Sequence, residues 1–202
     1  MNRTASDPRA PDSRLAKEAE DLVREACPPF LANHCLRSYA WAVALAGRER
    51  IRFDAELLYV AALLHDLGLV ARFDAGRCFE EDGARAAADL ARGHGWPDQR
   101  RQALAEAIRL HVAVEIAMDH GAEAYLLWHA TGLDVTGHRH DDIEPRTIAR
   151  VMSDYPRLDF ASGFTELLAD QAERKPRCWA ATAIESGIAA HIAASPLERA
   201  QG

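Results

Sequence analysis

The chain has 202 residues, 49% of them hydrophobic, and its 24 basic and 31 acidic side chains give a formal net charge of −7. A chain of this length suits one domain with a substantial core. The acidic balance excludes a nucleic-acid-binding role that depends on neutralising phosphates, although a small anionic substrate could still bind in a local basic pocket. Alanine and leucine dominate and alternating strand patterns are scarce, so the sequence predicts an all-α fold, a single-domain helical bundle.

The two ends of the chain differ from the rest. Residues 1–12 are polar, contain two prolines and lack the apolar stretch of a signal peptide. We therefore predict a disordered N-terminal tail, a domain over residues 13–197 and a short C-terminal tail at residues 198–202. No apolar run approaches the length of a membrane span, which predicts no membrane partner and a cytoplasmic location.

The cysteines show neither the pattern of a zinc knuckle nor that of a disulfide framework. None lies in a CxxC pair, and their spacing is irregular. Without a secretion signal, we expect all four to be reduced, as in a cytoplasmic protein: Cys27, Cys35, Cys78 and Cys178.

The first third of the chain contains three helical patterns. The first predicted helix covers residues 13–26 and ends at two prolines, which cannot continue it. The second covers about residues 31–50 and carries His34 near its beginning. The third begins after Asp54, a natural N-cap, and ends at Gly68, a natural terminator.

A loop at residues 70–79 separates these helices from the later ones. We predict the later helices at about residues 80–92, from Asp98 to before Gly121, at 122–131, from Pro145 onward, at 163–174 and at 183–194. Residues 132–137, which include Asp134, and the polar stretch 138–142 are predicted to lie outside helices.

The end of the third helix joins a histidine to an aspartate. His65 shares one helix face with Leu57 and Leu64, so it points inward, and Asp66 lies next to it. An ionised carboxylate in such a place needs a cation or strong hydrogen bonds. Imidazole and carboxylate are common ligands of zinc, iron and manganese. The alternative is a core histidine with satisfied hydrogen bonds and an aspartate that caps a neighbouring helix.

Four residues occur in the order His34, His65-Asp66, Asp134. In this order the sequence resembles the HD-domain superfamily of metal-dependent phosphohydrolases, over about residues 31–136. Five segments further resemble the cyanamide hydratase-like branch of that superfamily: His34-Cys35-Leu36-Arg37-Ser38, Leu64-His65-Asp66-Leu67-Gly68, Arg77-Cys78-Phe79-Glu80-Glu81-Asp82-Gly83-Ala84, Ile108-Arg109-Leu110-His111 and Leu133-Asp134-Val135-Thr136-Gly137.

The resemblance implies a bound divalent metal in a core of residues 31–137, with zinc as the first candidate and iron or manganese as others. Side chains from separate segments can converge on such a cation inside a helical bundle. The implied ligands are His34, His65, Asp66 and Asp134.

The resemblance also implies roles in catalysis and in substrate binding. Asp66 and His111 are the expected catalytic residues, and His111, Phe79 and Arg37 are the expected substrate contacts. The residues alone leave alternatives open. His111 also fits a buried histidine bonded to a backbone carbonyl, and Arg37 also fits an arginine packed along its helix.

Three functions compete on this basis. The leading one is a metal-dependent hydratase or hydrolase that adds metal-activated water to a small molecule, at a nitrile carbon and with a urea-type product in the cyanamide case. The second is a nucleotide or other phosphomonoester phosphohydrolase, which needs cations aimed at the phosphate. The third is a non-catalytic, metal-containing module that binds a small ligand. The arginines near the motifs are Arg37, Arg72, Arg77 and Arg109.

Several further residues suggest a partner or a structural role. The exposed part of an alanine-rich helix makes a homodimer the candidate assembly, beside a small-molecule substrate. His138 and His140 lie between turn residues, which predicts a solvated loop, with substrate gating as the alternative. The remaining side chains are expected to be structural, exposed or part of pocket walls: His94, His120, His129, Trp41, Trp96, Trp128 and Trp179.

Overall fold

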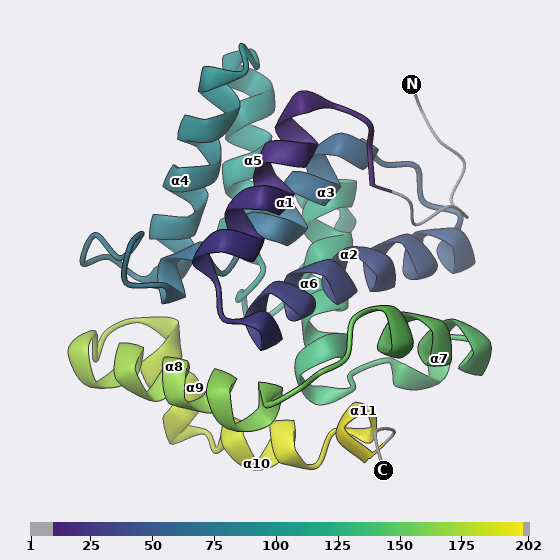
Figure 1. Ribbon diagram of the computed structural model, residues 1–202, viewed down its shortest axis with the longest axis vertical. Coiled ribbons are helices and arrows are strands. Elements are labelled where there is room, and N and C mark those ends of the chain that lie inside the picture. The colour runs from purple at the N-terminus through teal and green to yellow at the C-terminus, as the bar shows by residue number, and fades with distance from the viewer. Residues whose placement is uncertain (1–9, 200–202) are drawn as a thin grey trace.

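The structure of this chain is a computed structural model that describes residues 10–199 (Figure 1). These residues form helices without any strand, which confirms the predicted all-α class. The α-helices are α1 Arg14–Ala26, α2 Pro29–Glu49, α3 Ala55–Leu64, α4 Phe79–Gly93, α5 Asp98–Leu110, α6 Ala122–Thr136, α7 Pro145–Asp154, α8 Phe160–Arg174, α9 Trp179–Glu185, α10 Ile188–Ala193 and α11 Pro196–Arg199. The short 3-10 turns are η1 Leu67–Leu69, η2 Met118–His120 and η3 His140–Asp142.

The predicted tails fall mostly outside the described residues. This holds for nearly all of the N-terminal tail and for residues 200–202 of the C-terminal one. Residues 198 and 199 belong to α11, and the carboxylate of Glu198 pairs with the guanidinium of the buried Arg157 at 2.5 Å. The helical domain therefore reaches past the predicted boundary at residue 197, because an arginine buried inside the domain binds Glu198.

Two apolar helices, α2 and α3, form the centre of the fold. Helix α2 packs against α3 and α6, and α3 packs against α1 and α5. The residues of α3 from Leu57 to Leu64 are buried, as expected for a helix that is apolar on all sides. Asp54 begins this helix as predicted, because its carboxylate accepts hydrogen bonds from two backbone N–H groups in the first turn. Across residues 10–199, no helix combines the length and the apolar character that crossing a bilayer requires.

The C-terminal helices α8–α11 lie together along one side of the α1–α6 core (Figure 1). Helix α8 packs on α2 and α9, and α10 packs on α6. We predicted one helix over residues 183–194, but Gly187, with a φ angle of +80°, separates α9 from α10. Glycine adopts this left-handed conformation without a steric penalty, so the chain turns there.

Helix α6 is longer than the sequence predicted. It continues past residue 131 to Thr136, so Asp134 lies on a helix that packs against α2 and not in a loop. Gly132 stays inside the helix, and the terminator is Gly137, whose φ angle is +79° and whose N–H donates to a carbonyl of the last turn. Of the two glycines, only Gly137 adopts the left-handed backbone that ends a helix.

A disulfide joins Cys78 and Cys178, which lie 100 residues apart in the sequence. Cys78 directly precedes Phe79 at the start of α4, and Cys178 directly precedes Trp179 at the start of α9. The prediction of reduced cysteines is therefore wrong for this pair, because folding joins two loops that no sequence spacing relates. The predicted cytoplasmic location loses the support that it drew from reduced cysteines. The prediction holds for the two that are free and buried, Cys27 and Cys35.

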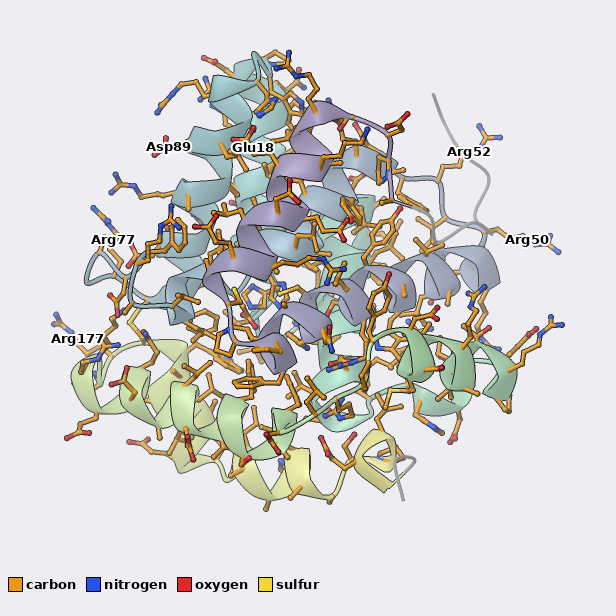
Figure 2. The ribbon with its side chains drawn as sticks, viewed as in Figure 1. Glu18, Arg50, Arg52, Arg77, Asp89 and Arg177 are labelled. Carbon is orange, nitrogen blue, oxygen red and sulfur yellow. A yellow bond between two sulfur atoms is a disulfide. The ribbon has the colours of Figure 1, made fainter. Side chains whose placement is uncertain are left out.

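Reducing this disulfide is expected to lower the free energy of unfolding by about 2–5 kcal/mol, because the bond closes a long loop in the unfolded chain. Both cysteines are half-buried, and Figure 2 shows Arg77 and Arg177, the residues before them, extending from the same edge of the molecule. A thiol reductant can therefore reach the bond. Guanidinium-induced unfolding with and without reductant measures the difference.

The control is a double variant with Cys78→Ser and Cys178→Ser. Its free energy of unfolding should match that of the reduced parent and should not respond to reductant. Equal stability of the oxidised and reduced parent protein would contradict the prediction.

Candidate metal centre

Three helices bring histidines and an aspartate together in the core. His34 lies in the second turn of α2, His65 is the C-cap of α3, and His111 is the C-cap of α5. Asp66 follows His65 and precedes η1. All four residues are buried. The predicted fifth helix ran on toward Gly121, whereas α5 ends just before His111, so the histidine stands at a helix end.

Two glycines allow α4 to close over this segment. A side chain at Gly68 would lie 2.1 Å from the carbonyl oxygen of Phe79, and one at Gly83 would lie 2.8 Å from that of His65. Because both distances are below van der Waals contact, only glycine lets the start of α4 rest on the turn at His65. The close approach brings the Phe79 ring against the edge of His111, with 5.7 Å between the ring centroids.

Hydrogen bonds fix the orientation of the three imidazole rings. Nδ1 of His34 bonds to Oδ2 of Asp134 at 2.7 Å. Nδ1 of His65 and Nδ1 of His111 each bond to a backbone carbonyl one turn earlier. Because carbonyl and carboxylate oxygens only accept, each Nδ1 carries a proton, and each ring in its neutral form presents a lone pair at Nε2.

The free ring nitrogens converge on Asp66. Nε2 of His34 and Nε2 of His65 are 3.1 Å apart, and they lie 3.4 and 3.3 Å from Oδ2 of Asp66. Nε2 of His111 lies 3.5 Å from Oδ1. Both oxygens are buried, and neither accepts a hydrogen bond from any described residue. Facing lone pairs beside an unpartnered carboxylate repel one another unless a cation lies between them.

The arrangement therefore fits a divalent cation. The ligand atoms of His34, His65 and Asp66 all lie within 4.8 Å of one another. Neutral imidazole nitrogens with a carboxylate oxygen are a ligand set that binds zinc and other transition metals.

The same contacts determine the charges of these groups. Burial lowers the pKa of His65. Burial acts in the same direction on His34, but its hydrogen bond to Asp134 and the nearby Asp66 outweigh it and raise the pKa of His34. Burial would raise the pKa of Asp66, but the surrounding imidazoles, His65 foremost, hold that pKa well below its usual value. Protons compete with a cation for these nitrogens, so metal affinity should fall as the pH falls.

Asp134 lies behind His34, outside the group of converging ligand atoms. Its carboxylate accepts hydrogen bonds from Nε and Nη2 of Arg37, both at 2.8 Å, and from Nε1 of Trp41 at 2.7 Å. Arg157 donates to the backbone carbonyl of Asp134 at 2.7 Å. The contacts thus differ from the predicted role of Asp134 as a direct ligand. Donors already bind both oxygens, and the carboxylate orients His34 from behind, as carboxylates commonly do beside metal-binding histidines.

Arg37, predicted as a substrate contact, lies away from the cavity in this structure. It is fully buried, does not line the cavity described below, and also donates to the carbonyls of Tyr155 and Pro156 at 3.1 and 3.2 Å. A sequence signal for its structural role existed, since residues 34, 37 and 41 share one face of α2. Arg157, in the loop between α7 and α8, carried no such signal.

A cavity of about 280 Å³ opens beside the cluster. The two other predicted substrate contacts, Phe79 and His111, line it together with His34, His65 and Asp66. No arginine or lysine of residues 10–199 is among the lining side chains. Sequence reasoning placed Trp128 and Trp179 in the core or in pocket walls, and both line the cavity. It gave no role in the site to other lining residues, which include Thr131, Val135 and Phe164.

The two histidines of the predicted solvated loop have different positions. His138 is exposed and lines the cavity, so it marks a point where the cavity reaches solvent. His140 lies in η3, outside the lining, with Nδ1 3.3 Å from Asp141. The solvated-loop prediction therefore fits His140, whereas the position of His138 fits the alternative of a residue at the cavity entrance.

His129 gives the protein a pH-dependent stability. Burial foremost, and then the charge of Arg139, lower the pKa of His129 from 6.5 to about 4. The unfolded chain therefore binds a proton between these values that the folded chain does not bind. The stability linked to His129 is present above about pH 6.5 and is lost as the pH falls toward about 4. The loss should be about 1–2 kcal/mol after allowing for solvent screening around a half-exposed ring.

The variant His129→Gln should lack this loss. Urea unfolding of parent and variant near pH 7 and near pH 4.5 provides the comparison. The difference in free energy of unfolding between parent and variant should shift in favour of the variant at the lower pH. A difference that is independent of pH would refute the role of His129.

Residues 31–118 match the family model described as the HD domain. This segment includes His34, His65, Asp66 and His111, which converge in the core. The chain therefore contains a segment that matches the HD domain, and this match supports a metal-dependent hydrolase or hydratase.

Two curated yeast proteins are similar to most of the chain. Cyanamide hydratase DDI2 of Saccharomyces cerevisiae is 29% identical over 174 residues, which cover 84% of this chain and 76% of the yeast protein. Cyanamide hydratase DDI3 of the same yeast has the same identity and coverage. These similarities confirm the resemblance to the cyanamide hydratase-like branch.

Proposed function

We propose that this protein is a metal-dependent hydratase that adds water to the carbon of a nitrile-like group in a small neutral molecule. One observation carries the proposal: the imidazole lone pairs converge on the unpartnered carboxylate of Asp66 beside a cavity that no arginine or lysine of the described chain lines. The similarity to yeast cyanamide hydratases supports the choice of reaction and makes cyanamide the first compound to test. Zinc is the proposed metal, because neutral imidazole and carboxylate ligands suit it.

The buried residues would have different roles in binding the cation. His34 and His65 would bind it through Nε2, and Asp66 through its carboxylate. When bound, the cation lowers the pKa of a water molecule to about 7 and polarises the group under attack. Asp134 keeps the proton of His34 on Nδ1, so that Nε2 stays free.

His111 is placed to move a proton. Its Nε2 lies 3.5 Å from Oδ1 of Asp66, and its ring lines the cavity. Hydration of a nitrile forms one carbon–oxygen bond and moves both protons of the water, one after the other, to the nitrogen, so the amide or urea product contains every atom of both reactants. Asp66 would accept each proton that leaves the attacking water, and Nε2 of His111 would take it from Asp66 and pass it to the nitrogen.

Phosphomonoester hydrolysis has weaker support, because a phosphate needs cationic donors aimed at its oxygens. Each arginine near the motifs binds a carboxylate elsewhere: Arg37 binds Asp134, Arg72 binds Glu25, Arg77 binds Asp82 and Arg109 binds Glu81.

The deciding experiment incubates metal-loaded protein with cyanamide and measures urea. The proposal expects turnover that Asp66→Asn removes and that chelation abolishes. Phosphate release from a nucleotide panel, with no urea formed, would favour the phosphohydrolase. The protein could also bind metal stoichiometrically, form neither urea nor phosphate, and retain one small molecule through purification. This result would favour the non-catalytic binding module.

A further inference from the structure

The cavity is much larger than cyanamide requires. It measures about 280 Å³. One water molecule needs only about 10–15 Å³ of cavity volume, so the cavity has room for a molecule many times larger than water. Cyanamide consists of one carbon and two nitrogen atoms besides hydrogen, so it would leave most of this space to solvent.

The extra space has apolar walls. Phe79 and Trp179 lie edge to face with ring centroids 6.1 Å apart, and both line the cavity with Trp128 and Phe164. Outside the buried cluster, the polar side chains of the lining are Thr131, Thr136 and, at the entrance, His138. Aromatic walls of this kind gain most from an apolar ring or branched chain, through burial and edge-to-face contact.

Most of these walls lie outside the segment that matches the HD domain. Residues 31–118 supply the cluster and Phe79, whereas Trp128 and Gly132 come from α6 and Phe164 and Trp179 from α8 and α9. The part of the cavity that would select a substrate is therefore built by later elements of this particular chain.

We propose that the substrate of this site carries an apolar group about the size of an aromatic ring next to its nitrile-like group, and that the whole molecule is neutral. This inference rests on the proposed hydratase function, which it narrows to N-substituted cyanamides and organic nitriles. The reacting group would lie against His111 and Asp66, and the apolar group against Phe79 and Trp179.

The first experiment compares two substrates and their products on metal-loaded protein. Benzylcyanamide should have a kcat/KM roughly 10- to 100-fold above that of cyanamide, because a buried ring adds binding energy near the reacting group. Calorimetry should show benzylurea binding tighter than urea by a similar factor, which tests the cavity without turnover. A 4-carboxybenzyl analogue should bind worse than the benzyl compound, because no described arginine or lysine lines the cavity.

Gly132 offers a way to fill the cavity. A Cβ atom at this helical position would meet only His138, at 3.8 Å or more, so the backbone accepts a larger residue. Gly132→Leu should lower the affinity for benzylurea roughly tenfold or more, because it fills space that the ring would use. Gly132→Ala should give a smaller loss and guards against a variant that does not fold. The matched control is Gly93→Leu, at an exposed helix end with no atom within 4 Å, which should keep the parent affinity.

The outcomes separate this inference from the proposed reaction. Equal binding of urea and benzylurea, or a kcat/KM for cyanamide above that for benzylcyanamide, would overturn the inference while leaving the hydratase in place. The protein could instead bind benzylurea, lose this binding in Gly132→Leu, and hydrate neither cyanamide nor benzylcyanamide. That outcome would support the ligand class and reject the reaction.

Discussion

Replacing Asp66 by asparagine is expected to abolish stoichiometric metal binding and to lower turnover by at least roughly a thousandfold, because without the cation the pKa of the attacking water returns to its much higher value in bulk water. The amide has the size of the carboxylate but no charge to balance a cation between His34 and His65. Elemental analysis of the purified variant and the urea assay measure the two effects.

The same variant and the parent should respond differently to added metal. In the metal-free parent, the buried carboxylate of Asp66 has no hydrogen-bond donor, so nothing in the described chain offsets its desolvation through a hydrogen bond. The nearby imidazoles balance its charge. Because the variant lacks this charge, the stability of the metal-free variant should not respond to metal. Added metal should raise the Tm of the parent alone, by mass action. A rise in the Tm of the variant with metal would contradict the site.

Asp82 provides a matched control. It is buried like Asp66, but its carboxylate accepts hydrogen bonds from the backbone N–H groups of Ala75 and Arg77. Asp82→Asn should lower stability and leave the metal content unchanged. If Asp82→Asn loses metal as Asp66→Asn does, the loss reflects damage to the fold and not the removal of a ligand.

Arg37→Ala is expected to destabilise the fold by about 3–5 kcal/mol, the range for breaking a buried ion pair from one side. The arginine is fully buried and holds Asp134 through two hydrogen bonds, and Asp134 in turn orients His34. Metal affinity should therefore fall as well, by roughly 10- to 100-fold, as it does when the partner of a ligand is lost. Chemical unfolding and competitive metal titration measure the two losses.

The pH dependence identifies the cause of this loss. Burial alone would raise the pKa of Asp134, but Arg37 foremost among its partners holds that pKa well below 3.8. The stability from this pair is present above the ordinary pKa of aspartate and is lost as the pH falls through the lowered value. In Arg37→Ala the buried carboxyl of Asp134 can become neutral. The loss of stability relative to the parent should therefore shrink below about pH 4. A loss of stability that is the same at all pH values would indicate lost packing instead of a lost ion pair.

Arg100→Ala is the control for this prediction. Arg100 pairs with Asp54 and Glu56 near the surface, where such pairs contribute about 0–1 kcal/mol. Its loss should leave metal affinity unchanged. Figure 2 shows the ordinary position of charged side chains in this molecule, with Arg50, Arg52 and Asp89 extending outward, in contrast to the buried pair at Arg37.

The sequence was informative where local chemistry decides the structure. Asp54 caps α3 because its side chain can reach the first backbone N–H groups, and this fixes where the helix that leads to His65 begins. The order of His34, His65 and Asp66 then predicted a cluster, and the structure brings these three together with His111.

Contacts between distant segments could not be predicted in this way. Whether Asp134 faces the cluster or Arg37 depends on how α6 packs against α2, and residue spacing carries no information on that packing. The pairing of Cys78 with Cys178 depends in the same way on α9 meeting the start of α4. The walls of the cavity come from several helices, so their shape appears only in the assembled fold.

The placement of α8–α10 over the cavity has a consequence for directed evolution. Mutations at Trp179 and Ile188 alter the cavity wall while the imidazoles and Asp66, which come from α2, α3, α5 and the turn after α3, are kept, whereas Phe164 of α8 also packs on the ring of His34. Libraries restricted to the C-terminal layer should therefore yield many folded proteins with new preferences. Descendants of one ancestral gene can diversify by the same route.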